Sequence, residues 1–442
     1  MITVIGGGPA GRFAAIHLSL AGEEVRLIEK RNALGGQCLH EGCMVICGLN
    51  DCAKLLDESE KLKSLRVLSN VPKASLPEIW KGINNIQSVI SKILEKETVD
   101  AGVKVISGEA FLNGTEVTLG NTRLESDSVL IATGSKPFVP KVSGRDIAGV
   151  FNPHNIAGIG EIPKKLVIVG GGIIAAEYSY IFSVLGSDVT IVSRSLFLRD
   201  KPDSLRKSAL KDLKRVTVKE YTLLREICGD KSVSGVILEN GGDKYEISCD
   251  AVLFASGLIP RTENISGIKT GDKGEILINE RYETSVKGVY AAGDVTGKVF
   301  MTPYARMQGI CAAKSILGEK PGEIPQVIPQ SIKLFYEHSF CSSVKPANLQ
   351  EISLPAPAGP GSFWSVPEKN TGMAQIQFEK DSGLITGMNL SGPSSSYVAS
   401  YMSYLMEKGL KAGDFEKFFE VHPSSDGIYG LVKYADSNLK KR

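Results

Sequence analysis

The chain has 442 residues, and its 51 Lys and Arg against 49 Asp and Glu give a formal net charge of +2. This balance gives no global argument for a nucleic-acid partner, and 42% hydrophobic with 23% charged residues is typical of a soluble globular protein. No apolar run reaches the roughly 18 residues of a membrane span, so we expect no membrane partner. Because a strand-like segment follows Met1 directly, we also expect no signal peptide and a cytoplasmic location.

The first 29 residues predict a strand, a glycine-rich turn, a helix and a second strand. In the turn Gly6-x-Gly8-x-x-Gly11, Gly6 permits the tight bend and Gly8 lets the backbone approach a pyrophosphate. Gly11 allows close packing of helix and strand, and the phosphates lie at the helix N-terminus. Glu29 follows Gly8 by 21 residues, where a carboxylate binds ribose hydroxyls. We interpret this unit as a flavin dinucleotide site.

Four of the eight cysteines, Cys38, Cys43, Cys47 and Cys52, lie close together after this unit. Clustered cysteines in a cytosolic protein indicate redox chemistry or metal binding. Their spacings differ from the usual zinc and iron–sulfur patterns, so we expect no metal. Cys47 and Cys52 are expected along a helix that follows Cys43, with Cys47 about one turn away as a third thiol.

A long helix is predicted at residues 78–102, and short strands with turns at 103–134. Residues 166–195 then repeat the strand–turn–helix–strand pattern. Their turn is Gly170-x-Gly172-x-x-Ala175, and the position equivalent to Glu29 is Ser193. Ser193, Arg194 and the nearby Arg199 can accept a 2′-phosphate that an acid would repel, so this site is expected to prefer NADPH, with NADH as the alternative donor.

Five motifs taken together resemble the flavin-dependent pyridine nucleotide–disulfide oxidoreductases, the family of glutathione reductase, dihydrolipoamide dehydrogenase and mercuric reductase. GGQCLHEGC at 35–43 is similar to the family's redox motif GGTCxxxGC, and His422-Pro423 is similar to its C-terminal dipeptide. The remaining three are similar to its cofactor loops: IATG (131–134), FASGLIPR (254–261) and VYAAGD (289–294). The resemblance implies FAD and nicotinamide contacts at Gly36, Ala132, Thr133, Gly134, Gly257, Gly293 and Asp294.

The resemblance implies an α/β fold with two Rossmann-like dinucleotide-binding domains and a C-terminal α/β interface domain. The expected divisions are an FAD-binding domain at 1–145 with a second segment at 262–322, an NAD(P)-binding domain at 146–261, and an interface domain at 323–442 that forms a homodimer.

By the same resemblance, electrons pass from NADPH through FAD to a Cys38–Cys43 disulfide and on to a small disulfide substrate. Cys38 is then the thiol that attacks substrate, and Cys43 lies against the flavin as a thiolate. His422 of the partner subunit is the acid/base, so the active site is shared by the dimer. The other histidines are interpreted as structural.

Two positions depart from the family pattern. In the family, a Glu equivalent to Glu177 pairs with a Lys, and the position equivalent to this Lys is Ile46 here. Either another cation therefore replaces the Lys, or Glu177 is partly protonated. The family's Glu that orients the His falls on Gly427, and Asp426, one residue earlier, is the candidate substitute.

The substrate is narrowed only by exclusion. No cysteine follows Cys341, which disfavours mercuric reductase and large thioredoxin reductase, and Ile16 stands where glutathione reductases have a substrate-binding Arg. Two alternatives stay open: an NAD-linked dihydrolipoamide dehydrogenase, and a flavoprotein electron-transfer subunit or sensor without small-disulfide turnover. Residues 340–375, rich in Pro, Ser and Gly, have no assigned role.

Overall fold

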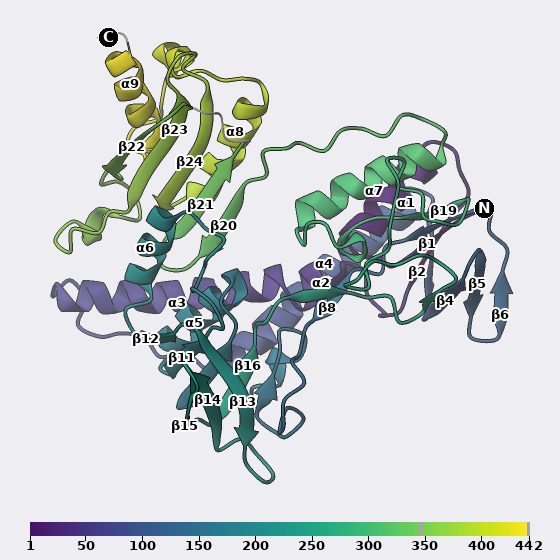
Figure 1. Cartoon of the computed structure of the whole chain (residues 1–442), viewed down its shortest axis with the longest axis horizontal. Coiled ribbons are helices and arrows are strands. Elements are labelled where there is room, and N and C mark those ends of the chain that lie inside the picture. The colour runs from purple at the N-terminus through teal and green to yellow at the C-terminus, as the bar shows by residue number, and fades with distance from the viewer. Residues whose placement is uncertain (344–347, 440–442) are drawn as a thin grey trace.

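The first sheet is parallel and carries the first glycine-rich turn. The computed structural model describes residues 1–343 and 348–439. This sheet has the order β19-β7-β1-β2-β3, and its strands are apolar enough to be covered on both faces. Its members are β1 (Ile2–Ile5), β2 (Val25–Glu29), β3 (Lys104–Ser107), β7 (Ser128–Ile131) and β19 (Val289–Ala291). Helices α1 (Pro9–Leu20) and α7 (Thr302–Ile316) pack against each other beside it (Figure 1).

The cysteine cluster lies on two helices that follow β2 and precede β3 in the chain. Cys38 is on the short α2 (Gly36–His40), and Cys43 begins the long α3 (Cys43–Ser64), which also carries Cys47 and Cys52 as expected. The predicted long helix is confirmed as α4 (Leu76–Asp100). The predicted short strands at 103–134 are confirmed too, and they include β4 (Ala110–Asn113), β5 (Glu116–Leu119) and β6 (Thr122–Leu124). These three join β18 (Ile265–Ser266) in one sheet, and β8 (Ser135–Pro137) pairs with β17 (Leu258–Pro260) in another.

The second glycine-rich turn belongs to another parallel sheet, of order β12-β11-β10-β16-β9. Its strands are β9 (Val150–Phe151), β10 (Lys165–Val169), β11 (Asp188–Val192), β12 (Val216–Lys219) and β16 (Ala251–Phe254). Helix α5 (Ile173–Leu185) follows the turn, packs on α3, and is succeeded by α6 (Asp203–Asp212). An antiparallel sheet completes this part: β13 (Thr222–Cys228), β14 (Gly235–Asn240) and β15 (Asp243–Ser248).

The last part of the chain forms an antiparallel sheet, β20-β21-β24-β23-β22, with helices α8 (Ser395–Glu407) and α9 (Ile428–Leu439) (Figure 1). Its strands are β20 (Gln330–Lys333), β21 (Glu337–Ser342), β22 (Leu349–Pro355), β23 (Met373–Glu379) and β24 (Ile385–Gly392). The unassigned stretch 340–375 thus supplies strands of this sheet, while its residues 344–347 lie outside the described part. The α/β fold class with two Rossmann-like units and a C-terminal α/β unit is confirmed.

A buried polar cluster joins α6 to the C-terminal sheet. The ring of His338 on β21 is fully buried, and its Nε2 lies 2.9 Å from Asp212 Oδ2 while its Nδ1 lies 2.9 Å from Ser391 Oγ. The Tyr336 backbone N–H donates to the same Asp212 oxygen. Because each of these groups is paired away from water, the cluster fixes how the two parts meet.

Within the described ranges, no helix combines the length and the apolar character needed to cross a membrane.

Candidate functional site

A cavity of about 1470 Å³ runs past both glycine-rich turns and the cysteine pair. It is larger than the roughly 300–1,000 Å³ of an ordinary ligand pocket, as expected for a site that receives two dinucleotides. The turns follow β1 and β10, so the cavity lies at the carboxyl ends of parallel strands, where open α/β sheets bind ligands.

The first turn presents bare backbone to the cavity. A Cβ on Gly36 would lie 2.7 Å from the Gly8 Cα, so a larger residue at position 36 would collide with the backbone of the first turn. Gly11 is not in the cavity wall; a Cβ there would meet the Gly6 carbonyl oxygen at 2.0 Å, which is the predicted close packing of helix and strand. The N-terminus of α1 therefore opens onto a backbone cradle suited to a pyrophosphate.

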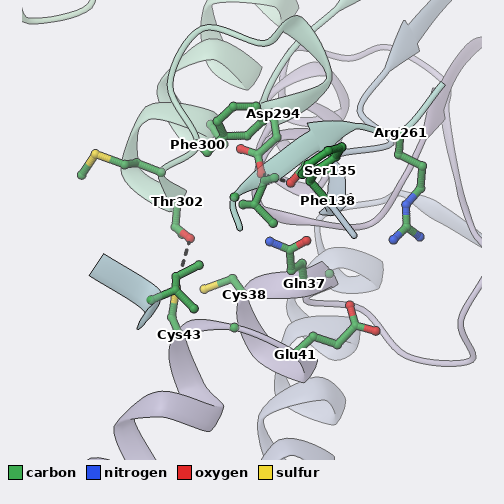
Figure 2. Close-up of a pocket in the computed structure, with 18 of the residues that line it drawn as sticks. Gln37, Cys38, Glu41, Cys43, Ser135, Phe138, Arg261, Asp294, Phe300 and Thr302 are labelled. Carbon is green, nitrogen blue, oxygen red and sulfur yellow. Dashed lines mark hydrogen bonds between the residues drawn. The ribbon is translucent and has the colours of Figure 1, made fainter. Parts of the chain in front are cut away.

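Two carboxylates, those of Glu29 and Asp294, line the part of the cavity near the first turn. Glu29 is buried, and it accepts hydrogen bonds from the backbone N–H of Gly7 at 2.7 Å and of Arg31 at 2.9 Å. The Ser135 hydroxyl donates to Asp294 at 2.7 Å (Figure 2), while burial raises the pKa of Asp294. Both carboxylates line the cavity, as do Gly6, Gly8 and Gly36.

The loops predicted from the family motifs converge on the same cavity. Its lining includes Gly6, Ala132, Thr133, Gly134, Gly257 and Gly293. Thr133 Oγ1 donates to the Arg261 carbonyl at 2.6 Å, which ties the first motif loop to the second. Arg261 Nε is buried with no hydrogen-bond partner among the described residues, although Arg261 lines the cavity. An unpaired donor at the wall fits a cavity that holds a polar ligand, and with the bare glycine cradle it fits FAD.

The second turn repeats the arrangement with a different charge. Gly170, Gly172 and Ser193 line the cavity, and Arg194 and Arg199 are exposed at its wall. Ala175 is instead fully buried on α5, where it packs in the core. Lys201 adds a further cation that the motif did not indicate; its Nζ lies 2.8 Å from Gln330 Oε1. Asp200 also lines the cavity, and its Oδ1 lies 3.3 Å from Arg199 Nε, so three cations stand against one acid in this group.

Cys38 and Cys43 face each other across the break between α2 and α3 (Figure 2), and both thiols are free in the structure. The sulfur–sulfur hydrogen bond raises the pKa of Cys38, and burial raises it further. The same bond lowers the pKa of Cys43, and Thr302, whose Oγ1 lies 3.7 Å from Cys43 Sγ, lowers it too. Thr302 is the first residue of α7, so Cys43 Sγ also lies by a helix N-terminus. The pair is thus asymmetric, and Cys43 is the more acidic of the two thiols.

Glu177 on α5 lies at the same end of the cavity as Cys43 and Ile46. Burial raises the pKa of Glu177 to about 8, and its Oε1 accepts the backbone N–H of Lys333 at 3.0 Å. The Lys333 charge acts in the opposite direction and lowers this pKa. The structure therefore supports both alternatives posed by Ile46: burial raises the pKa of Glu177, and a cation from β20 lies near it.

Cys47 lines the cavity beside Cys43, whereas Cys52 does not. Burial raises the pKa of both thiols. Among the residues that the structure describes, no cluster of His, Cys, Asp or Glu could hold a metal ion.

The two predicted C-terminal site residues lie away from the cavity of their own chain. His422 is exposed, and the described cavity wall contains neither it nor Asp426. Asp426 accepts hydrogen bonds from the Tyr401 hydroxyl and, through Oδ1, from the Ile428 backbone N–H at 2.9 Å. Both carboxylate oxygens are thus engaged at the start of α9, so the orientation of His422 by Asp426 stays a prediction.

Sequence reasoning missed Thr302, Ser135, Arg306 and Lys333. The charge of Arg306, one turn beyond Thr302 on α7, lowers the pKa of Cys38. Thr302 and Ser135 had local signals, because Thr302-Pro303 is a typical helix start and Ser135 directly follows the IATG motif. Arg306 and Lys333 are brought to the site only by the tertiary structure.

Comparison with known proteins identifies the family. The model of the pyridine nucleotide-disulphide oxidoreductases matches residues 1–309. A dihydrolipoyl dehydrogenase from Buchnera aphidicola subsp. Schizaphis graminum is 29% identical, over 96% of this chain and 92% of its own. A soluble pyridine nucleotide transhydrogenase from Pseudomonas syringae pv. syringae is 27% identical, over 99% and 98%.

A solved structure has the same fold. The HOCl-induced flavoprotein disulfide reductase RclA from Escherichia coli superposes with a TM-score of 0.86 at 23% identity, over 98% of this chain and 99% of that one. Together with the family match over most of the chain, this establishes the identity: the protein belongs to the pyridine nucleotide-disulphide oxidoreductase family, whose members are flavin-dependent enzymes.

Proposed function

We propose that the protein is an NADPH-dependent flavoprotein that reduces a small disulfide substrate through Cys38 and Cys43. The observation that carries the proposal is the asymmetric thiol pair, which lies in the wall of the cavity that also contains both dinucleotide-type turns. FAD would be held by the backbone cradle at Gly6, Gly8 and Gly36, and it would supply the hydride and two-electron chemistry that connects a nicotinamide with the Cys38–Cys43 pair.

The chain's own residues then carry the exchange. Opening the disulfide leaves Cys43 as a thiolate beside Thr302, and Cys38 as a thiol. Once deprotonated, Cys38 attacks the substrate disulfide, forms a mixed disulfide and releases the first thiol product. Cys43 then attacks Cys38, re-forms the internal bond and releases the second thiol product. Two electrons and two protons pass to the substrate in each cycle.

We assign the FAD-binding, NAD(P)-binding and interface roles to the segments expected from the sequence, 1–145 with 262–322, 146–261 and 323–442. The second site is assigned to NADPH because Ser193 replaces an acid and Arg194, Arg199 and Lys201 make this end of the cavity basic.

We assign the acid/base role to the partner's His422 in a homodimer. The C-terminal segment exposes apolar side chains around this histidine, with Phe419 at 96% and Val421 at 81% exposure. Exposed apolar clusters of this kind mark interaction surfaces. Tyr397 and Tyr404 on α8 are also exposed.

An anaerobic titration of the purified protein with NADPH, and separately with NADH, tests the proposal. NADPH should be the better donor, and a long-wavelength absorption band from the Cys43 thiolate should appear after two electrons. In Cys38→Ala the flavin should still be reduced while turnover of disulfides disappears. Bleaching without the band, or full turnover by Cys38→Ala, would refute the relay.

The NAD-linked dihydrolipoamide dehydrogenase remains the second candidate, because several relatives of 26–29% identity carry the name dihydrolipoyl dehydrogenase. A strong preference for NADH in the same titration, with turnover of dihydrolipoamide, would favour it over NADPH-dependent reduction.

A further inference from the structure

Lys333 brings a cation of the C-terminal sheet to the redox end of the cavity. It is the last residue of β20, its side chain is half-buried, and it lines the cavity with Cys43, Cys47 and Glu177. Strand β20 is in contact with α5, the helix that carries Glu177. The sequence separates Lys333 from Glu177 by 156 positions, so no local pattern could pair them.

The contact with Glu177 is made through the backbone of Lys333, and the ammonium group takes no part in it. The Lys333 N–H donates to Glu177 Oε1 at 3.0 Å, which holds the carboxyl group against β20. The Lys333 Nζ lies 3.4 Å from Glu337 Oε1, and Glu337 also accepts the Ser396 backbone N–H at the start of α8. Glu337 thereby anchors the lysine side chain.

The titratable groups around Lys333 come from three elements. Cys43 and Cys47 lie on α3 with Asp51 beyond them, Glu177 lies on α5, and Glu337 lies on β21. The residues of α3 that line the cavity are Cys43, Ile46 and Cys47, and none of them carries a positive charge. The Lys333 charge lowers the pKa of Cys47 and of Glu177, against burial, which raises both.

We propose that Lys333 is a positioning residue that holds Glu177 by its backbone and supplies the positive charge of this wall, in place of a cation on α3. The inference rests on the proposed function for its meaning, since Glu177 and Cys43 share the wall where flavin and thiolate meet. It follows that the C-terminal sheet supplies the positive charge near Cys43, Cys47 and Glu177. The normal ionisation of these thiol and carboxyl groups therefore requires an intact β20.

Cys47 is the reporter that tests this charge without relying on turnover. The rate at which iodoacetamide modifies Cys47, followed by peptide mass spectrometry over a range of pH, gives its thiolate fraction. In Lys333→Met, loss of the charge should raise the pKa of Cys47 and slow its modification at pH 8 by up to about tenfold, since one pKa unit is a factor of ten. Lys333→Arg should keep the wild-type profile.

A variant that moves the positive charge from position 333 to position 46 distinguishes an electrostatic effect of Lys333 from a structural one. In Ile46→Lys/Lys333→Met a lysine returns on α3, one position before Cys47, and the wild-type rate should be largely restored. Lys207→Met, which removes an exposed lysine on α6 paired with Asp203, is the matched control and should change nothing. An unchanged Cys47 profile in Lys333→Met, or a slowed rate that the double variant fails to restore, would overturn the proposal.

The anaerobic titration distinguishes a failure of the proposed function from a failure of the role assigned to Lys333. If the wild type shows no thiolate band, the relay is refuted while the Cys47 profiles still report on Lys333. If the band forms normally in the wild type and Lys333→Met leaves the Cys47 profile unchanged, the role of Lys333 alone is refuted.

Discussion

The hydroxyl of Thr302 should set the pH at which Cys43 becomes a thiolate. Thr302→Val removes the hydroxyl that lies 3.7 Å from Cys43 Sγ and keeps the side-chain shape and the N-terminus of α7. A hydrogen bond to a charged group contributes roughly 1.5–3 kcal/mol, and the long contact to sulfur argues for the lower end. About 1.5 kcal/mol corresponds to roughly one pKa unit.

The sign follows from which form the hydroxyl stabilises. Because Thr302 favours the thiolate, its removal should raise the pKa of Cys43 by about one unit and lower the thiolate fraction at mildly acid pH. The assay is a pH titration of the long-wavelength band in the two-electron-reduced protein. Thr302→Ser, which keeps a hydroxyl, should titrate close to wild type. If Thr302→Val also titrates like wild type, the hydroxyl does not contribute and the helix N-terminus with Cys38 accounts for the lowered pKa.

The remaining predictions concern stability. Glu177 has its pKa raised to about 8 in the folded protein, so folding takes up a proton and the free energy of unfolding should fall as pH rises from about 4.5 to about 8. Glu177→Gln should flatten this dependence in urea melts at pH 5 and 9; an equally steep fall in the variant would show that another group is responsible. His338→Ala removes one partner of the buried pair with Asp212 and should cost about 3–5 kcal/mol, seen as an earlier urea transition. A loss below about 1 kcal/mol would mean that water replaces the ring.

Sequence patterns predicted most of the fold, and most of the residues predicted for the cofactor sites line one cavity. The two glycine turns predicted parallel sheets with helices because glycine spacing and apolar strands are local properties, and Glu29 and Ser193 were identified by their distance from those turns. The sequence predicted that Glu177 could have a replacement cation, but it could not identify which residue supplies it. Lys333 lies 156 positions away and belongs to a different sheet.

Asp426 illustrates the opposite limit. Its position one residue before the expected Glu made it a candidate partner for His422, but an acid just before a helix also accepts the first backbone N–H groups of that helix. In the structure Asp426 does this for α9 and also accepts the Tyr401 hydroxyl. Sequence distance alone could not decide between these two uses of one carboxyl group.

The placement of β19 at the edge of the first sheet has a consequence for synthesis of the chain. β19 pairs with β7, yet the residues between these two strands include every strand of the β12-β11-β10-β16-β9 sheet. During translation the second sheet can assemble as soon as residue 254 has left the ribosome, while the first still has an open edge. Asp294 and α7 come later still, so the nascent chain can complete the sheet of the second glycine-rich turn before the cavity at the first turn has all of its wall.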